Sequence, residues 1–253
     1  MKIETLQQFI EQRLMLEQYA SLDASLNGLQ CGRPDKEIHK IAFSVDATLE
    51  TFVKAAEEHA DALFVHHGLF WGKPLAVTDT HYARIATLIR HDIALFAAHL
   101  PLDAHPELGN NAAMAQMLHL KEVTPFGNYH GVDIGFKGVL PTAITAEEIV
   151  ATLNFTYEDG LKILPFGKKE ISRVGIVSGG AASTVEQAIE EGLDAFITGE
   201  CSHSMYSYCV EAGITMICGG HYATEVFGVQ KMEQEIKKKF DCETVFIDAP
   251  TTL

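Results

Sequence analysis

The chain of 253 residues is long enough for one large or two small domains, each with a proper buried core. Its formal net charge of −15 disfavours generic binding to nucleic acid or to a membrane surface, because an acidic protein does not attract phosphate groups or anionic lipids. No apolar run approaches the roughly 18 residues of a membrane span, so we expect no membrane partner.

The first 14 residues space their apolar side chains as an amphipathic helix does. In "MKIETLQQFIEQRL", Ile3, Leu6 and Ile10 recur at helical intervals among polar residues. This segment therefore predicts a helix rather than a signal peptide. The five cysteines of the chain form no CxxC pair, which favours reduced thiols and a cytoplasmic protein.

Residues 41–68 and 174–201 share one pattern. Each has a short apolar strand, a turn of small and polar residues, an amphipathic helix and a second strand that opens with Asp-Ala, at Asp61 and Asp194. Such β-α-β units build parallel sheets. Both copies continue with a helix, a strand and a His-x-x-x-acid motif. The sequence therefore predicts an α/β fold of two similar halves, related by internal duplication, with mainly parallel strands.

The segment between the copies differs from both. It is rich in glycine, and Thr145 and Glu148 have the spacing of a capping box at a helix start. We expect a first α/β repeat with the N-terminal helix at 1–120, a small α+β insertion at 121–170 and a second α/β repeat at 171–253. The two halves are expected to form one compact unit.

Ionisable side chains follow the predicted strands of both copies. In sheets of β-α-β units, ligands collect beyond the carboxyl ends of the strands. Imidazoles and carboxylates concentrated without Lys or Arg are what a divalent metal site requires. The first copy supplies His66, His67, His99 and Asp103, and the second supplies Glu200, His203, His221 and Glu225.

The adjacent pair His66 and His67 raises a geometric question, because neighbouring residues of an extended strand point in opposite directions. The two imidazoles can bind one ion only if the strand has turned, for which Gly68 supplies the freedom. Otherwise they serve two neighbouring ions, which a carboxylate of Asp103 or Glu225 could bridge.

Other residues near these strand ends allow more than one role. His99, Glu200 and His203 are candidate catalytic residues, which would orient ligands or carry protons, although a histidine that closes a strand is often purely structural. Cys201 and Cys218 are interpreted as small buried apolar residues rather than ligands.

Five stretches along the chain carry a family resemblance: "NGLQCG", "FVHHGLFW", "AHLPLDAHPELGNNAAMA", "DAFITGE" and "GGHYATE". With them the chain resembles the NGG-one-interacting-factor-three-like family, which includes the bacterial YbgI proteins and is often labelled GTP cyclohydrolase I type 2 homologue. The resemblance implies a toroidal homohexamer, a trimer of dimers, with a dinuclear centre in each subunit. The ligands it implies are His66, His67, Asp103, His221 and Glu225.

One departure concerns the segment before Asp103. Many relatives have Thr-His-Thr-x-x-Asp where this chain has Ala98-His99-Leu100-Pro101-Leu102-Asp103. The carboxylate is kept, but hydroxyls that could support it are lost.

The leading functional hypothesis is a metal-dependent hydrolase that holds two divalent ions per chain and directs a metal-bound hydroxide at a small molecule. The family label suggests a nucleotide or heterocyclic substrate. Nitrogen and oxygen ligands without thiolate admit zinc, iron, manganese or nickel. Two alternatives stay open: a ring-forming, metal-binding interaction or regulatory protein without catalysis, and a nucleotide-binding α/β module that uses the turn "VSGGAAS" and keeps its ligand when metal is removed.

Overall fold

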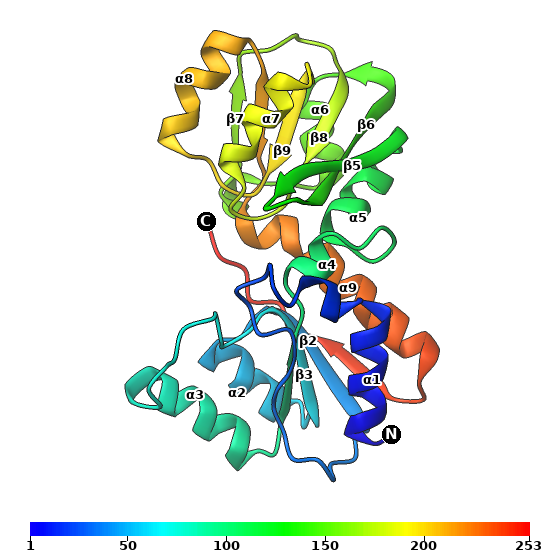
Figure 1. Cartoon of the computed structure of the whole chain (residues 1–253), viewed down its shortest axis with the longest axis vertical. Coiled ribbons are helices and arrows are strands. Elements are labelled where there is room, and N and C mark those ends of the chain that lie inside the picture. The colour runs from blue at the N-terminus through cyan, green and yellow to red at the C-terminus, as the bar shows by residue number, and fades with distance from the viewer. The chain divides into compact units, whose positions relative to one another are not determined.

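The computed structural model describes all residues, 1–253, and the chain folds as two compact units (Figure 1). Unit 1 consists of residues 1–102 and 228–249, and unit 2 of residues 103–227 and 250–253. The predicted divisions after residues 120 and 170 are not the places where these units divide. Residues 121–170 contribute three strands to the sheet of unit 2, as described below.

Unit 1 is built on a five-stranded sheet of order β1-β4-β3-β2-β11. The pairs β11–β2, β2–β3 and β3–β4 are parallel, and only the edge strand β1 is antiparallel to its neighbour. The strands are β1 (Gly28–Cys31), β2 (Lys40–Asp46), β3 (Ala62–His67), β4 (Ala94–Ala97) and β11 (Glu243–Phe246). The parallel β2-α2-β3 unit predicted from residues 41–68 is thus present.

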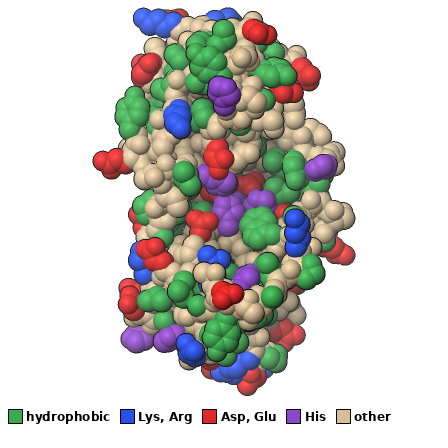
Figure 2. All heavy atoms as spheres, turned by 90° about the vertical axis from the view of Figure 1, so that its left-hand side faces the viewer, with side chains coloured by type: hydrophobic (Ala, Val, Ile, Leu, Met, Phe, Trp, Pro, Cys, Tyr) green, Lys and Arg blue, Asp and Glu red, His purple; other side chains and the backbone are tan.

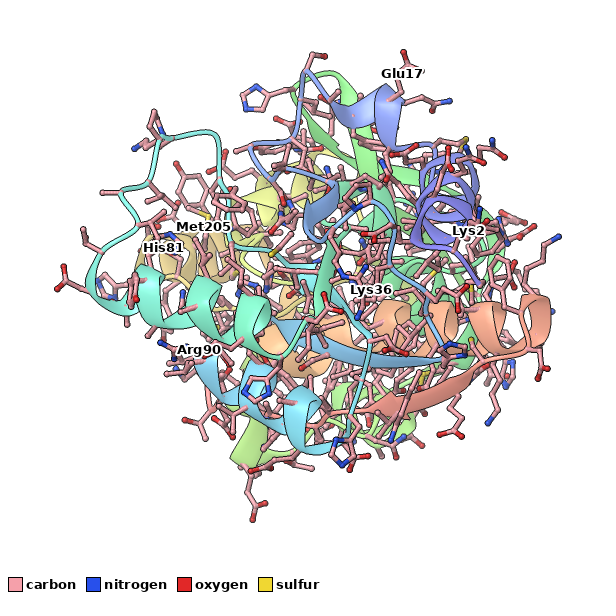
Figure 3. All side chains as sticks on the ribbon, turned by 90° about the horizontal axis from the view of Figure 1, so that it is seen from below. Lys2, Glu17, Lys36, His81, Arg90 and Met205 are labelled. Carbon is pink, nitrogen blue, oxygen red and sulfur yellow. The ribbon has the colours of Figure 1, made fainter.

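Helices cover both faces of this sheet (Figure 1). Phe52 and Leu88 of α2 (Leu49–Glu57) and α3 (Asp79–Arg90) pack on a cluster that contains Leu63 of β3. Figure 3 labels His81, near the start of α3, and Arg90, at its end. The predicted N-terminal helix is α1 (Ile3–Arg13), and it is followed by a 3-10 turn at Leu16–Tyr19. Phe9 of α1 meets Phe240, just after α9, with ring centroids 5.1 Å apart.

Unit 2 contains a six-stranded sheet of order β5-β6-β8-β9-β10-β7. Its central strands β8, β9 and β10 are parallel, whereas β5, β6 and β7 pair antiparallel. The protein is therefore an α/β protein with two mixed sheets, and mainly parallel pairing holds for unit 1 alone. The strands are β5 (Lys121–Tyr129), β6 (Val132–Ile144), β7 (Lys162–Pro165), β8 (Ile171–Ile176), β9 (Ala195–Thr198) and β10 (Thr215–Cys218).

The side chains of β9 alternate between two cores, as a strand period of two requires. Ile197 packs with helices α5 and α6, whereas Phe196 packs with α7 and α8 on the other face of the sheet. The capping box predicted at Thr145 and Glu148 is confirmed at the start of α6. The helices are α4 (Leu100–Asp103), α5 (Asn110–Met117), α6 (Ala146–Leu153), α7 (Val185–Glu190), α8 (His203–Ala212) and α9 (His221–Lys239), with 3-10 turns at Tyr157–Asp159 and Ala182–Thr184.

The surface agrees with the acidic composition of the chain. Figure 2 shows acidic side chains spread over the visible face, with single Lys and Arg side chains between them and no broad basic patch. No helix combines the length and the apolar character that would let it cross a membrane.

Candidate metal centre

Three histidines meet at the carboxyl ends of β3 and β4 in unit 1. His66 and His67 are the last residues of β3, and His99 follows β4 by two residues. Each offers a ring nitrogen within 4.8 Å of those of the other two. The ring centroids of His66 and His67 lie 4.6 Å apart, so these neighbours converge although both belong to the strand. This cluster could hold a metal ion.

The Nδ1 atom of every histidine in this cluster is already hydrogen-bonded. His66 Nδ1 lies 2.9 Å from the carbonyl oxygen of Ala98, His67 Nδ1 lies 2.8 Å from Asp46 Oδ1, and His99 Nδ1 lies 2.9 Å from Asp23 Oδ1. A carbonyl or an ionised carboxylate only accepts, so Nδ1 carries the hydrogen in all three rings. The Nε2 atoms then keep the lone pair that a metal ion needs.

Asp23 holds His99 from a loop that precedes β1. Its side chain is 1 % exposed and also accepts from the Asn27 amide and from the backbone N–H groups of Ser25 and Leu100. Burial raises the pKa of Asp23, but the hydrogen bonds from His99, Asn27 and Ser25 outweigh it, so the pKa is lowered on balance. Asp23 is therefore ionised and fixes His99 in one orientation.

Gly68 provides space at this edge rather than a left-handed turn. Its φ is not positive, but an added Cβ would lie 2.2 Å from Gln30 Nε2 and 2.7 Å from Ala97 Cβ. The loop that follows brings Trp71 against His99, with ring centroids 4.9 Å apart. Trp71 thus covers the histidine cluster on one side.

Unit 2 gathers a second group of candidate ligands where β10 gives way to α9. His221 is the first residue of α9, and its Nε2 lies 3.1 Å from Glu225 Oε2, one turn later. A carboxylate oxygen of Glu225 also lies within 4.8 Å of one of Asp103. Glu225 and Asp103 are 3 % and 5 % exposed. Two buried carboxylates at this separation repel each other, and a divalent cation would neutralise them.

Polar neighbours orient both Asp103 and His221. Asp103 Oδ1 accepts from Asn110 Nδ2 and from the hydroxyl of Ser178, each at 2.9 Å. Hydroxyl support for this carboxylate, which the residues before Asp103 lack, therefore comes from the loop after β8. Glu200 Oε1 lies 2.6 Å from His221 Nδ1. Burial lowers the pKa of His221, but Glu225 and Glu200 outweigh it and raise the value to about 9.

One glycine lets these groups approach one another. Gly179, with φ +66°, lies so close to Glu225 that an added Cβ would stand 2.1 Å from Oε1. The backbone N–H of Gly179 donates to Thr224 Oγ1, and that of Ser178 donates to Asn111 Oδ1. In the turn "VSGGAAS", these two backbone N–H groups are therefore bonded to the protein, whereas a bound phosphate would need such donors.

The structure places the three candidate catalytic residues differently. His99 belongs to the histidine cluster and Glu200 contacts His221, as described above. His203 is exposed at the start of α8 and makes no hydrogen bond or ion pair with either of them. Sequence reasoning missed Asp23, Asp46 and Ser178. A signal existed for Asp46, an acidic residue at the end of a strand beside β3, but none existed for Asp23.

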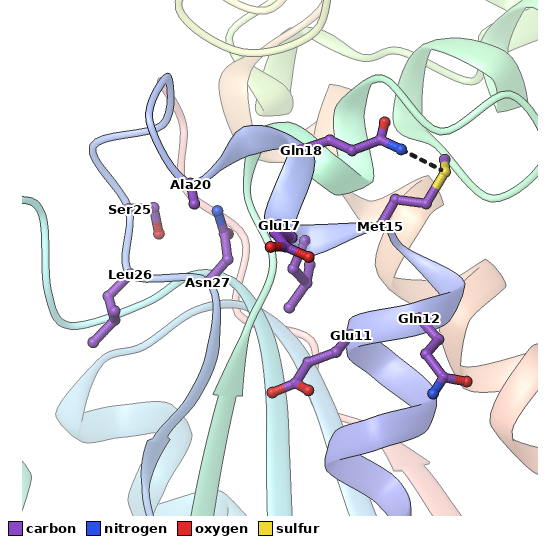
Figure 4. A pocket seen from close by; sticks show the side chains of 10 residues that line it. Glu11, Gln12, Met15, Glu17, Gln18, Ala20, Ser25, Leu26 and Asn27 are labelled. Atoms are coloured by element: carbon purple, nitrogen blue, oxygen red, sulfur yellow. Dashed lines mark hydrogen bonds between the residues drawn. The ribbon is translucent and has the colours of Figure 1, made fainter.

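A surface cavity lies elsewhere in unit 1. It has a volume of about 670 Å³ and lies between α1 and the loop that leads to β1 (Figure 4). Its lining combines apolar residues such as Leu16 and Leu26 with the acidic residues Glu11 and Glu17. Within it, Gln18 Nε2 donates to Met15 Sδ at 3.5 Å. Asn27, which also lines it, accepts the backbone N–H of His99 through Oδ1. The cavity adds no metal-binding group to the histidine cluster.

Known proteins resemble this chain over its whole length. The family model described as Duf34/NIF3 (NGG1p interacting factor 3) matches residues 1–252. A relative from Deinococcus radiodurans named GTP cyclohydrolase 1 type 2 homolog is 44 % identical over 231 residues, which cover 91 % of this chain and 88 % of the relative.

Solved structures give the same result. A protein titled ybgI, of unknown function, is 32 % identical with a TM-score of 0.91, and all of both chains is covered. The structure of TTHA1606 from Thermus thermophilus is 36 % identical with a TM-score of 0.89, again with full coverage of both chains. The resemblance noted from the sequence is confirmed by these comparisons.

Proposed function

The chain belongs to the Duf34/NIF3 (NGG1p interacting factor 3) family, and from this premise we propose that it is a metal-dependent hydrolase with a dinuclear centre. Its relatives are named GTP cyclohydrolase 1 type 2 homologues, so a nucleotide or a related heterocycle is the proposed substrate class. The ligands in this proposal are His66, His67, Asp103, His221 and Glu225.

The observation that carries the proposal is the shared hydrogen-bonding pattern of the histidines. In His66, His67 and His99 the Nδ1 atom is bonded to an acceptor of the protein. Metal-binding histidines usually donate their other ring N–H in this way, which fixes the ring and makes the ligating nitrogen more basic. Histidines with a purely structural role need not all use Nδ1 for their hydrogen bonds and keep Nε2 for another partner.

The donor types fit divalent metal ions. Imidazole nitrogens with the carboxylates of Asp103 and Glu225 suit zinc, iron, manganese or nickel, and no thiolate takes part. When bound, two such ions supply Lewis acidity, which lowers the pKa of water and polarises an oxygen of the substrate. Carboxylate-rich sites commonly leave positions for water or substrate, unlike closed structural zinc sites.

The residues around the ligands have positioning and proton-carrying roles in this mechanism. Asp46 and the Ala98 carbonyl orient His67 and His66, and Glu200 orients His221. His99, held by Asp23 and covered by Trp71, is the proposed proton carrier to the leaving group. The exposure of His203 makes it the weaker candidate for that role.

Metal content tests the proposed centre. Elemental analysis of the purified protein is expected to find about two divalent ions per chain. His67→Ala and Glu225→Ala should each lose metal, whereas His39→Ala, whose side chain is 75 % exposed, should keep it. Equal trace metal in the wild type and all three variants would contradict the dinuclear centre.

Catalysis needs a separate test. The metal-loaded protein should hydrolyse at least one member of a panel of nucleotides and fused-ring heterocycles, and Glu225→Ala should lose that activity. A protein that holds two ions but turns over nothing in the panel would favour the alternative of a metal-binding interaction or regulatory protein. Nucleotide binding that survives metal removal would favour the nucleotide-binding module, although the donors of its proposed turn are already used.

The assembly and location of the protein are also proposals. From the family resemblance we expect a homohexamer, a trimer of dimers, in the cytoplasm. Light scattering should then give the mass of about six chains of 27.8 kDa each. A mass of one or two chains would contradict this expectation.

A further inference from the structure

Cys201 and Cys218 contact each other at the carboxyl edge of the sheet in unit 2. Cys218 ends β10 and is paired in register with Thr198 of β9, three residues before Cys201. Each thiol shifts the pKa of the other, so the two side chains lie close together. Both pack in the core cluster that contains Phe196. The sulfur atoms are thus neighbours in the folded chain, although 17 positions separate the residues.

Only one of the two thiols is accessible. Cys218 is 1 % exposed, whereas Cys201 is partly exposed and lines a cavity of about 240 Å³. Since a water molecule occupies roughly 30 Å³, this cavity has room for a small solute such as a peroxide. Lys162 and Glu200 also line it. A small oxidant can therefore meet Cys201 before it meets Cys218.

The surroundings give the two thiols opposite character. The neighbouring Cys218, assisted by the charge of Lys162, lowers the pKa of Cys201 against the effect of burial. Cys201, together with burial, raises the pKa of Cys218. Burial also raises the pKa of the three other cysteines, Cys31, Cys209 and Cys242. Cys201 is the one thiol of the chain with added thiolate character, which is the form that reacts with oxidants.

We propose that Cys201 and Cys218 are an oxidisable dithiol, which hydrogen peroxide or an organic hydroperoxide converts into an intramolecular disulfide. Cys201 is the attacking thiol, and Cys218 is the resolving thiol. The inference is independent of the metal centre and of the proposed hydrolase activity.

The chemistry balances with a peroxide as the oxidant. The Cys201 thiolate attacks one peroxide oxygen, the O–O bond breaks, and the leaving hydroxide takes a proton to become water, which leaves Cys201 as a sulfenic acid. The Cys218 sulfur then attacks the Cys201 sulfur, the S–O bond breaks, and a second water leaves with the Cys218 proton. Two thiols and one hydrogen peroxide thus give one disulfide and two waters, with the peroxide reduced by two electrons.

The position of this pair links it to the candidate site. Cys201 directly follows Glu200, whose carboxylate contacts His221. A bond from Cys201 to the end of β10 would therefore tie down the segment that orients His221. The retention of metal by the oxidised form is therefore a second property to measure. Formation of the disulfide itself does not depend on metal.

The test treats the purified full-length protein with excess hydrogen peroxide, stops the reaction with catalase, and alkylates the remaining thiols under denaturing conditions. Alkylatable thiols should fall from five to three per chain, and peptide mapping should find Cys201 linked to Cys218. Dithiothreitol should restore all five. The disulfide should form equally in protein stripped of metal with a chelator, so failure of the metal proposal would leave this result unchanged.

Two variants sharpen the result. Cys201→Ser should form no disulfide, whereas Cys209→Ser should still form it, since Cys209 is a buried neighbour in the same cluster. The proposal is overturned if the five thiols resist peroxide, if Cys201 accumulates as sulfinic acid while Cys218 stays alkylatable, or if the linked peptide contains Cys209.

Discussion

In each unit of this protein, an aspartate side chain accepts two backbone N–H groups of a neighbouring strand, and we call this aspartate the anchor. The side chains that follow the anchored strands differ between the units. In unit 1, Asp61 accepts the backbone N–H groups of His39 and Lys40 at the start of β2, and in unit 2, Asp194 accepts those of Ser172 and Arg173 in β8. Each aspartate opens the second strand of its β-α-β segment. The anchors match although few of the surrounding residues do, which supports duplication as a proposal.

The strand ends that follow differ in their chemistry. β3 ends in His66 and His67, whereas the corresponding residues after β9 are Gly199 and Glu200. His67 is a candidate ligand, and Glu200 instead orients one. The strand-helix-strand pattern common to both units therefore sets where these side chains emerge, while single residues decide whether a unit supplies nitrogen ligands or buried carboxylates.

The orienting groups also come from different places. In unit 2, His221 is held by Glu200, a residue of the repeat itself. In unit 1, His99 is held by Asp23, which lies outside the segment 41–68 that shares its pattern with 174–201. Unit 1 therefore depends on a contact that unit 2 has no equivalent for.

Removal of that contact should have the largest effect. Asp23→Ala leaves four hydrogen-bond donors without their buried acceptor, so we expect a loss of about 3 kcal/mol in the free energy of unfolding. Chemical denaturation measures it. Asp35→Ala, at an aspartate whose side chain is 78 % exposed, is the control and should leave the midpoint unchanged. Equal midpoints for both variants would show that Asp23 does not organise this loop.

A glycine in unit 2 is expected to rank next. Gly179→Ala adds both backbone strain at φ +66° and a clash with Glu225 Oε1. Gly131→Ala shares the positive φ, at +93°, but meets nothing within 4 Å. We expect about 1 kcal/mol for Gly131→Ala and about 2.5 kcal/mol for Gly179→Ala in thermal or chemical unfolding. The idea that this glycine makes room for Glu225 fails if the two substitutions cost the same.

The paired anchors allow a direct comparison between the units. Asp194→Ala should cost about 2 kcal/mol and Asp61→Ala about 1 kcal/mol, because the side chain of Asp194 is 7 % exposed and that of Asp61 is 27 % exposed. Burial raises the pKa of Asp194, but Lys168 and two backbone N–H groups outweigh it and lower the value. Its contribution is therefore present above the unfolded pKa of about 4 and disappears as the pH falls through the folded value.

Denaturation curves at several pH values check this order. The difference between the wild type and Asp194→Ala should shrink as the solution is acidified below about pH 4. A difference that stays constant over that range would mean that the carboxylate charge of Asp194 does not stabilise unit 2.

The smallest expected effects concern the carboxylates that orient ligands in each unit. Asp46→Asn in unit 1 and Glu200→Gln in unit 2 keep the size of the side chain but lose its charge. Each should weaken metal binding about 10-fold in competition with a chelator. Glu186→Gln, at an exposed residue of α7, is the matched control. Identical affinities in all three variants would remove the positioning role from Asp46 and Glu200.

Sequence patterns predicted the repeated elements because strand and helix periods are local properties. The alternation in residues 41–68 and 174–201 was sufficient to predict parallel β-α-β units and the strand ends at His67 and Glu200. Strand pairing between distant segments was not predictable in this way. The strands of residues 121–170 join the sheet of unit 2, and β11 joins the sheet of unit 1. Each pairs with a strand that would otherwise have an unpaired edge. No local sequence pattern shows which strand has such an edge.

The candidate site shows the same limit. Histidines at strand ends were visible in the sequence, but Asp23 lies 76 positions from His99 and meets it only through the loop before β1. Ser178 supports Asp103 across 75 positions. Such contacts depend on tertiary packing, so the ligands could be predicted from the chain and most of the groups that orient them could not.

X-ray absorption at the edge of the metal found in the purified protein tests the central claim most directly. We predict scattering from imidazole and carboxylate ligands at about 2.0 to 2.2 Å and a metal–metal vector of about 3.5 to 4 Å. A single isolated ion, or sulfur scattering at about 2.3 Å, would contradict a dinuclear centre with imidazole and carboxylate ligands.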